Sequence, residues 1–146
     1  MGNDALEQKL HDLYSSGDIE QLSTQLAELG SEGMVQEWPQ SGERIRGRDN
    51  ILAVNQHYEG ATGTAPSLTL RRIVKPGDAW IVEGTIDYGD GTPVSLVSIL
   101  EADADGKIVR ATDYFASPFE APEWRRQWVD LDAGRRAHDR RSHDGL

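Results

Sequence analysis

Apolar positions repeat at helical spacing in the first sixty residues of the chain and at strand spacing after residue 66. Leucine and tyrosine side chains three or four positions apart predict an amphipathic helix over residues 5–15. A second helix is expected to follow the N-cap residue Asp18, with Gln21 at the capping-box position, and to end at Gly30. A third helix is expected from about Asp49 to Glu59.

Beyond a connector at residues 60–66, apolar and polar positions alternate, as they do in half-buried strands. Four strands are predicted, over residues 67–74, 79–88, 93–102 and 107–116. The segments between them are rich in Gly, Asp and Pro, which suits hairpin turns. This order predicts an α+β domain in which a curved antiparallel sheet carries three N-terminal helices on one face. A short extended segment at residues 34–38 precedes the third helix.

Length and composition indicate one domain over residues 1–131. Residues 132–146 are rich in Arg, His and Asp without an apolar period, and we expect a disordered tail there. The chain has no cysteine, which excludes disulfides and thiolate metal sites. With no long apolar run and no signal-peptide pattern, a cytoplasmic protein without membrane association is expected. The net charge of −10 argues against nucleic acid as a partner.

One carboxylate lies among small apolar positions of the last predicted strand. Alternation places Asp113 on the same strand face as Val109, Ala111 and Phe115. Burying a lone charge is costly, so this carboxyl group needs a partner or a raised pKa. Two roles remain open for it: a general base that handles a ligand in a cavity, or a structural carboxylate bonded to Tyr14, Trp38 or a backbone amide.

Two sequence segments carry a family resemblance. The run WPQSGERIRG at residues 38–47 and the run DYFASPF at residues 113–119 resemble the nuclear transport factor 2-like superfamily, and most closely its SnoaL-like proteins, over residues 4–129. The resemblance implies a cone-shaped domain with a mostly apolar cavity. Polyketide cyclases, limonene-epoxide hydrolases, ketosteroid isomerases and non-catalytic binding domains share that fold, so the fold alone assigns no activity.

The resemblance also suggests two catalytic carboxylates. Asp113 matches the catalytic Asp that cyclases and epoxide hydrolases keep on the last strand, and Asp87 looks like the second Asp of the epoxide hydrolases. Those hydrolases place an Arg two residues before the second Asp, where this chain has Thr85, which argues against epoxide hydrolysis unless an Arg of the 67–74 strand replaces it. Simple alternation turns Asp87 to solvent, unless a bulge at Gly84 shifts the phase.

Aromatic side chains are the candidates for ligand contacts. Tyr14, Trp38 and Tyr58 could line the cavity and stack on a flat ligand, or could simply be core residues. His57 lies on the third predicted helix and is either a proton shuttle or a surface residue. His, Asp and Glu are nowhere clustered at ligand spacing, so neither a metal site nor a cofactor is expected.

The sequence thus predicts a SnoaL-like cavity protein, with a homodimer formed through the open sheet face and its apolar residues Trp80, Val82 and Ile86. The leading hypothesis is a cofactor-free cyclase or isomerase that uses an Asp as acid or base on a small, apolar, oxygenated ligand. The alternatives are a non-catalytic domain for ligand binding or dimerisation, and an epoxide hydrolase-like enzyme.

Overall fold

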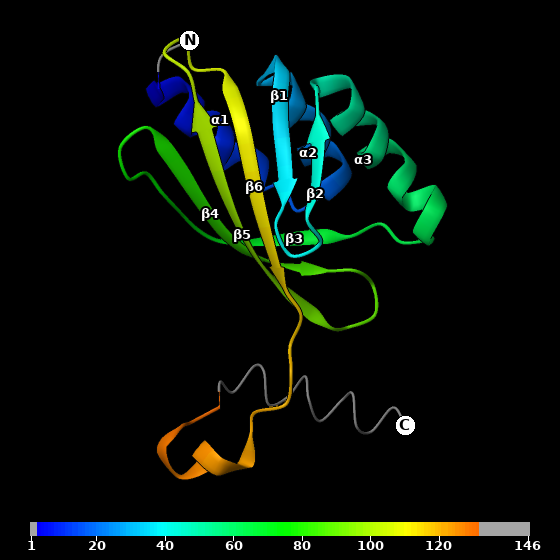
Figure 1. The fold of residues 1–146 in the computed structure, drawn as a ribbon, viewed down its shortest axis with the longest axis vertical. Coiled ribbons are helices and arrows are strands. Elements are labelled where there is room, and N and C mark those ends of the chain that lie inside the picture. The colour runs from blue at the N-terminus through cyan, green and yellow to red at the C-terminus, as the bar shows by residue number, and fades with distance from the viewer. Residues whose placement is uncertain (1–2, 132–146) are drawn as a thin grey trace.

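Three α-helices form before residue 66 in the computed structural model, which describes residues 3–131 (Figure 1). They are α1 (Asn3–Tyr14), α2 (Ile19–Glu28) and α3 (Arg48–Thr62), and all three confirm the predicted helices with small shifts at their ends. Asp18 is the N-cap of α2, because its carboxylate accepts a hydrogen bond from the backbone N–H of Gln21 at 3.1 Å. The predicted tail at residues 132–146 lies outside the described residues.

The sheet has six strands in the spatial order β2-β1-β6-β5-β4-β3. Their bounds are β1 (Gly30–Trp38), β2 (Glu43–Arg46), β3 (Ser67–Val74), β4 (Ala79–Asp87), β5 (Pro93–Ala102) and β6 (Ile108–Ala116). The meander from β3 to β6 is antiparallel, as predicted. However, β1 runs parallel to β6, so the sheet is mixed rather than wholly antiparallel. A parallel pair needs a long connection, and here the chain passes through β2, α3 and three further strands before β6 pairs with β1.

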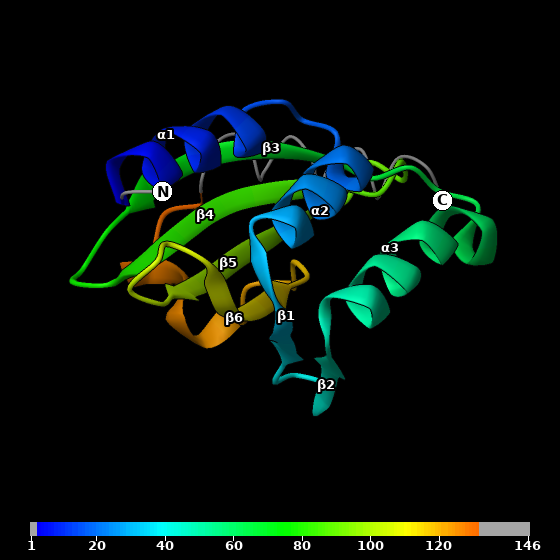
Figure 2. The ribbon, with the colours of Figure 1, turned by 90° about the horizontal axis from the view of Figure 1, so that it is seen from above.

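The core lies between the helices and the concave face of the sheet, and Figure 2 shows the strands curving beneath α1 and α2. Leu6 and Leu10 of α1 are fully buried. Trp80, Val82 and Ile86 of β4 are buried in the same cluster. The prediction that these three β4 residues form an exposed dimer patch is therefore wrong. Alternation grouped them correctly on the apolar face, but that face is the one that the helices cover.

Two irregularities in the strands change which side chains face inward. The β5–β6 register shifts between Glu101 and Ala102, where Val109 is the additional residue of β6. Val109 is exposed and Ile108 takes the inner position, so the predicted inward orientation of Val109 is wrong. This is the usual effect of a bulge on alternation.

The other irregularity lies in β3 at Arg71, which follows Leu70, the residue that pairs with Gly84. A β-carbon placed at Gly84 would lie 2.8 Å from the backbone oxygen of Thr69, so the strands could not approach this closely with a larger residue. The strand β4 itself pairs without interruption with β5. No phase shift therefore occurs in β4, and Asp87 stays on the outer face.

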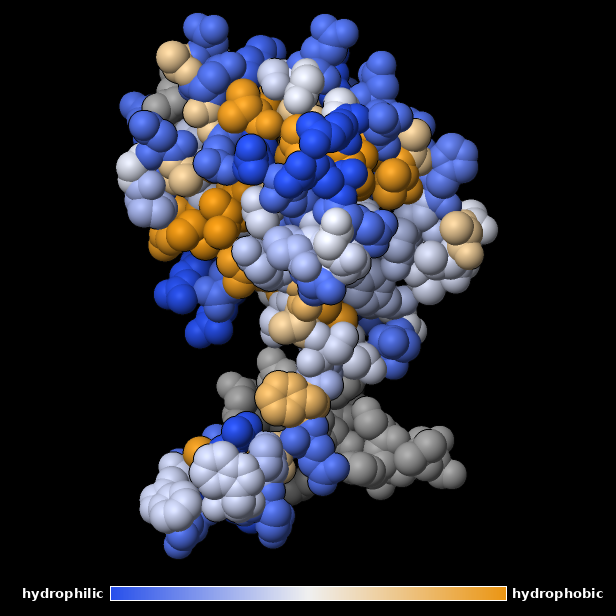
Figure 3. All heavy atoms as spheres, in the orientation of Figure 1, coloured by the Kyte–Doolittle hydropathy of each residue, from blue (hydrophilic) through white to orange (hydrophobic). Residues whose placement is uncertain are grey.

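After β6 the chain leaves the body of the domain and forms the 3₁₀ helix η1 (Glu123–Trp128), below the sheet in Figures 1 and 3. The largest apolar side chains after β6 are exposed: Phe119 at 78%, Trp124 at 74% and Trp128 at 70%. The sequence pattern gave no prediction for this segment. Among residues 3–131, no helix combines the length and the apolar character required to cross a bilayer.

Candidate active site

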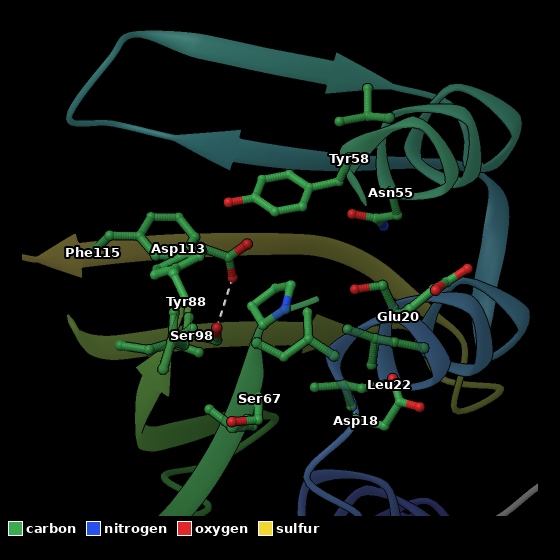
Figure 4. Close-up of a pocket in the computed structure, with 18 of the residues that line it drawn as sticks. Asp18, Glu20, Leu22, Asn55, Tyr58, Ser67, Tyr88, Ser98, Asp113 and Phe115 are labelled. Atoms are coloured by element: carbon green, nitrogen blue, oxygen red, sulfur yellow. Dashed lines mark hydrogen bonds between the residues drawn. The ribbon is translucent and has the colours of Figure 1, made fainter. Parts of the chain in front are cut away.

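A pocket of about 840 Å³ opens between α2, α3 and the concave face of the sheet (Figure 4). Apolar side chains form much of its wall, including Leu22, Leu26, Val54, Leu68, Ile86 and Leu96. Polar side chains also line the pocket, among them Ser16, Ser41 and Asn55. A pocket of this size, apolar with a few polar groups, is typical of small-molecule sites.

Asp113 lies at the floor of this pocket and is only 7% exposed. The Ser98 hydroxyl donates a hydrogen bond to Oδ1 at 2.7 Å, because Ser98 of β5 is directly opposite Asp113 in the register. The Gln36 amide donates from Nε2 to Oδ2 at 2.6 Å, and the Trp38 indole donates from Nε1 to Oδ2 at 3.2 Å. The parallel pairing of β1 with β6 brings these last two donors to the carboxylate.

Burial raises the pKa of Asp113 above its ordinary value, while the hydrogen bonds from Ser98, Gln36 and Trp38 partly counteract this rise. Desolvation disfavours the carboxylate, and the three donors favour it. A carboxylate with a raised pKa accepts a proton more readily than an exposed Asp does, which favours a role as a general base.

Tyr14 supports this floor from the end of α1. Its side chain is 2% exposed and shares a hydrogen bond with Ser98. Because Ser98 gives its own proton to Asp113, its oxygen accepts from the Tyr14 hydroxyl. Burial, together with the charge of Asp113, raises the pKa of Tyr14, so this hydroxyl keeps its proton. Of the two predicted partners of Asp113, Trp38 binds it directly and Tyr14 acts through Ser98.

Aromatic rings form the remaining walls of the pocket. Trp38 and Phe115 meet edge to face, with 6.4 Å between their ring centres. The ring centres of Tyr58, from α3, and Tyr88 lie 6.2 Å apart. In Figure 4 the Tyr58 side chain reaches from α3 across the pocket toward Asp113. The pocket therefore contains all three of the aromatic residues proposed from the sequence, Tyr14, Trp38 and Tyr58.

Two predicted site residues lie elsewhere. Asp87 is exposed on the outer face of β4, outside the pocket, and its carboxylate accepts a hydrogen bond from the Gly89 backbone N–H at 2.8 Å. His57 is exposed on α3, and its Nδ1 lies 2.7 Å from the Ala53 carbonyl oxygen. The uninterrupted alternation of β4 explains why Asp87 lies on the outer face. The side of α3 that faces the pocket carries Tyr58 and not His57.

Among residues 3–131, no arginine lines the pocket to serve as the cation of an epoxide hydrolase. Arg71 and Arg72, the two arginines of β3, both pair with Glu83 on the outer face of the sheet. One carboxylate of the expected pair thus lies outside the pocket, and both candidate arginines are bound to another acid.

Gln36 and Ser98 are site residues that sequence reasoning did not propose. Ser98 gave a weak signal, since it is a polar residue on a strand that is otherwise apolar on both faces. Gln36 gave a signal only through alternation, because Met34, Gln36 and Trp38 share one face of β1. Neutral polar residues are common on strands, so neither position was distinctive without the contacts.

The SnoaL-like domain family matches residues 8–111, which contain α2, α3 and all strands except the end of β6. The chain belongs to this family. It is also 34% identical to an NTF-2 like protein of unknown function from Burkholderia xenovorans LB400. That similarity covers 89% of this chain and 98% of the other, with a TM-score of 0.67. The resemblance inferred from the two sequence segments is confirmed.

Other solved SnoaL-like and related structures carry isomerase descriptions. A protein from Kribbella flavida DSM 17836, described as a "putative ketosteroid isomerase", is 30% identical over 88% of this chain and 87% of its own, with a TM-score of 0.71. An isomerase of the SnoaL-like family from Agrobacterium tumefaciens str. C58, also described as putative, is 12% identical over 76% of this chain and 94% of its own. Its TM-score of 0.57 shows the shared fold alone. No curated protein matches the chain.

Proposed function

We propose that this SnoaL-like protein is a cofactor-free enzyme that moves a proton on a small, largely apolar, oxygenated ligand, with Asp113 as the general base. The observation that carries the proposal is a buried carboxylate at the floor of an open apolar pocket, held by three side-chain donors. The description of the Kribbella flavida relative as a "putative ketosteroid isomerase" agrees with this reaction class.

The chemistry would begin with proton abstraction. Asp113 removes a proton from a carbon next to a carbonyl group, which leaves an enolate and a neutral carboxylic acid. If the acid returns the proton at a different carbon, the reaction is an isomerisation. If the enolate carbon instead attacks a second carbonyl group of the same ligand, the new carbon–carbon bond closes a ring and the alkoxide takes the proton from Asp113.

Four neighbouring side chains support these steps. Tyr58 lies on the wall opposite the β-sheet and points toward Asp113 (Figure 4), so its hydroxyl is the candidate donor to the enolate oxygen. Ser98, Gln36 and Trp38 are positioning residues, because they fix the carboxylate through hydrogen bonds. Apolar walls exclude water and keep the basicity of the carboxylate high.

Hydrogen–deuterium exchange tests the proposal without knowledge of the natural substrate. Cyclic ketones and 1,3-diketones would be incubated with the protein in D₂O, and deuterium uptake next to the carbonyl group would be followed by NMR. We expect exchange above background, and a loss of about 10²-fold or more in Asp113→Asn. Asp87→Asn, which makes the same substitution outside the pocket, should exchange like the unmodified protein.

A non-catalytic binding domain is the second candidate, and one observation favours it. Both oxygens of Asp113 already accept hydrogen bonds from the protein, as in a structural carboxylate. In that case Asp113→Asn would change stability or ligand affinity, and exchange would stay at background in every variant. Equal exchange in folded Asp113→Asn and in the unmodified protein would rule out Asp113 as the base.

A further inference from the structure

Three hydrogen-bond donors at the floor of the pocket are directed at Asp113. Gln36 and Trp38 donate to Oδ2, and Ser98 donates to Oδ1. The Tyr14 hydroxyl forms a hydrogen bond with Ser98. A ligand that reaches the floor with a carbonyl oxygen or an anionic group therefore meets few donors, because the Ser98 hydroxyl and the Trp38 indole are used on Asp113 and the Gln36 amide keeps only its second N–H.

Acceptor capacity, in contrast, remains at the floor. A carboxylate offers about four acceptor positions, and the protein uses three of those on Asp113. Next to it, Oε1 of Gln36 is buried and has no partner. The floor is thus short of donors, and a ligand group that carries an N–H or O–H proton is the complement to it.

The charges of the lining residues act in the same direction. The charged side chains among the described pocket residues are the acids Asp18, Glu20, Glu43 and Asp113. Within residues 3–131, no Lys, Arg or His side chain lines this pocket. An anionic ligand would be repelled from the entrance to the floor, and at the floor the low dielectric makes this repulsion strongest.

The aromatic walls add a preference for positive charge. Tyr14, Trp38, Tyr58, Tyr88 and Phe115 all line the pocket. The faces of aromatic rings attract cations, and groups of such rings around an acid are a common way to bind an ammonium group. A protonated amine would gain from this attraction, whereas a hydroxyl group would gain only the hydrogen bond.

We infer that this pocket selects ligands that carry no anionic group and that present a hydroxyl or a protonated amine to Asp113. The inference rests on the proposed function in one respect, since it takes the same pocket as the ligand site. It goes further by naming a polar group of the ligand: a hydrogen-bond donor occupies the acceptor positions left on Asp113 and on Oε1 of Gln36, beside the carbon that loses its proton, and carboxylates and phosphates are excluded.

Three probes with one apolar body test this selection: 1-adamantylamine, 1-adamantanol and adamantane-1-carboxylate, each titrated into the full chain at pH 7 by calorimetry. We expect the amine and the alcohol to bind at least tenfold more tightly than the carboxylate. In Asp113→Asn the ratio of amine to carboxylate affinity should fall at least tenfold. Asp87→Asn is the matched control and should keep the original ratio.

The inference is overturned if the carboxylate binds as tightly as the amine, if none of the three probes binds, or if Asp113→Asn leaves the ratio unchanged. These measurements need no turnover. Selective binding without deuterium exchange would contradict the proposed function alone. Exchange combined with equal binding of amine and carboxylate would contradict only the selection described here.

Discussion

At the scale of single residues, Asp113 is a charged side chain that is almost fully buried, and burying a carboxylate is costly. Its three donors come from two strands, so the cost is offset only when β1, β5 and β6 are all in place. The site and the sheet are thus coupled, because the carboxylate that the pocket needs is also a group that the fold must stabilise.

This coupling predicts a pH-dependent stability. The folded chain holds the Asp113 proton more tightly than the unfolded chain does, because burial raises the pKa. The free energy of unfolding should therefore decrease as the pH rises from the ordinary range of Asp to the folded pKa, and stay lowered above it. The loss amounts to about 1.4 kcal/mol for each unit by which the two pKa values differ.

Asp113→Asn provides the comparison for that prediction. The new side chain of this variant can still accept hydrogen bonds from Gln36 and Trp38 through its amide oxygen, and its amide nitrogen can donate one to the Ser98 oxygen. Urea unfolding at a series of pH values should show the variant gaining stability relative to the unmodified protein as the pH rises. A constant difference between the two proteins across the acid range would contradict the raised pKa.

At the scale of elements, Gly84 controls the approach of β3 to β4. A β-carbon there would lie 2.8 Å from the Thr69 carbonyl oxygen, which is backbone and cannot rotate away. We expect Gly84→Ala to lower the free energy of unfolding by about 1–3 kcal/mol, as overpacking does elsewhere. Gly60→Ala, in α3 and with open space around it, should instead stabilise by up to about 1 kcal/mol. Thermal unfolding of both variants measures these two opposite changes in stability.

The sequence predicted the helices and the strands of the meander well, but it did not predict the strand bulges or the long-range strand pairing. Alternation placed Asp113 and Phe115 inward, which the pocket confirms. It failed at Val109, because a bulge depends on how the neighbouring strand pairs and not on the residue itself. The parallel pairing of β1 with β6 is also a long-range property. Since that pairing delivers Gln36 to the carboxylate, the contact could not be predicted from local pattern.

At the scale of the whole molecule, the segment from Phe119 to Leu131 carries its large apolar side chains away from the body of the domain (Figure 3). Exposed apolar groups of this size commonly mark surfaces where proteins associate. We expect self-association of the chain to depend on this segment rather than on Trp80, Val82 and Ile86, which are buried.

Sedimentation of a double variant, Trp124→Ser with Trp128→Ser, measures that dependence. Both side chains are largely exposed, so the melting temperature of the domain at low concentration should change by no more than a few degrees, while the mass of the assembly should fall. An unchanged assembly would place the contact elsewhere, and a large loss of melting temperature would show that the segment supports the domain itself.

The unpaired Oε1 of Gln36 has a consequence for motion in this molecule. While Asp113 is ionised, the amide must present its nitrogen to the acid and leave its oxygen idle. Once the acid carries a proton, a half-turn of the Gln36 amide lets its oxygen accept a hydrogen bond from the acid O–H. Each proton that arrives at the acid should thus be accompanied by rotation of one side chain, and the ¹⁵N resonance of that amide would record the event.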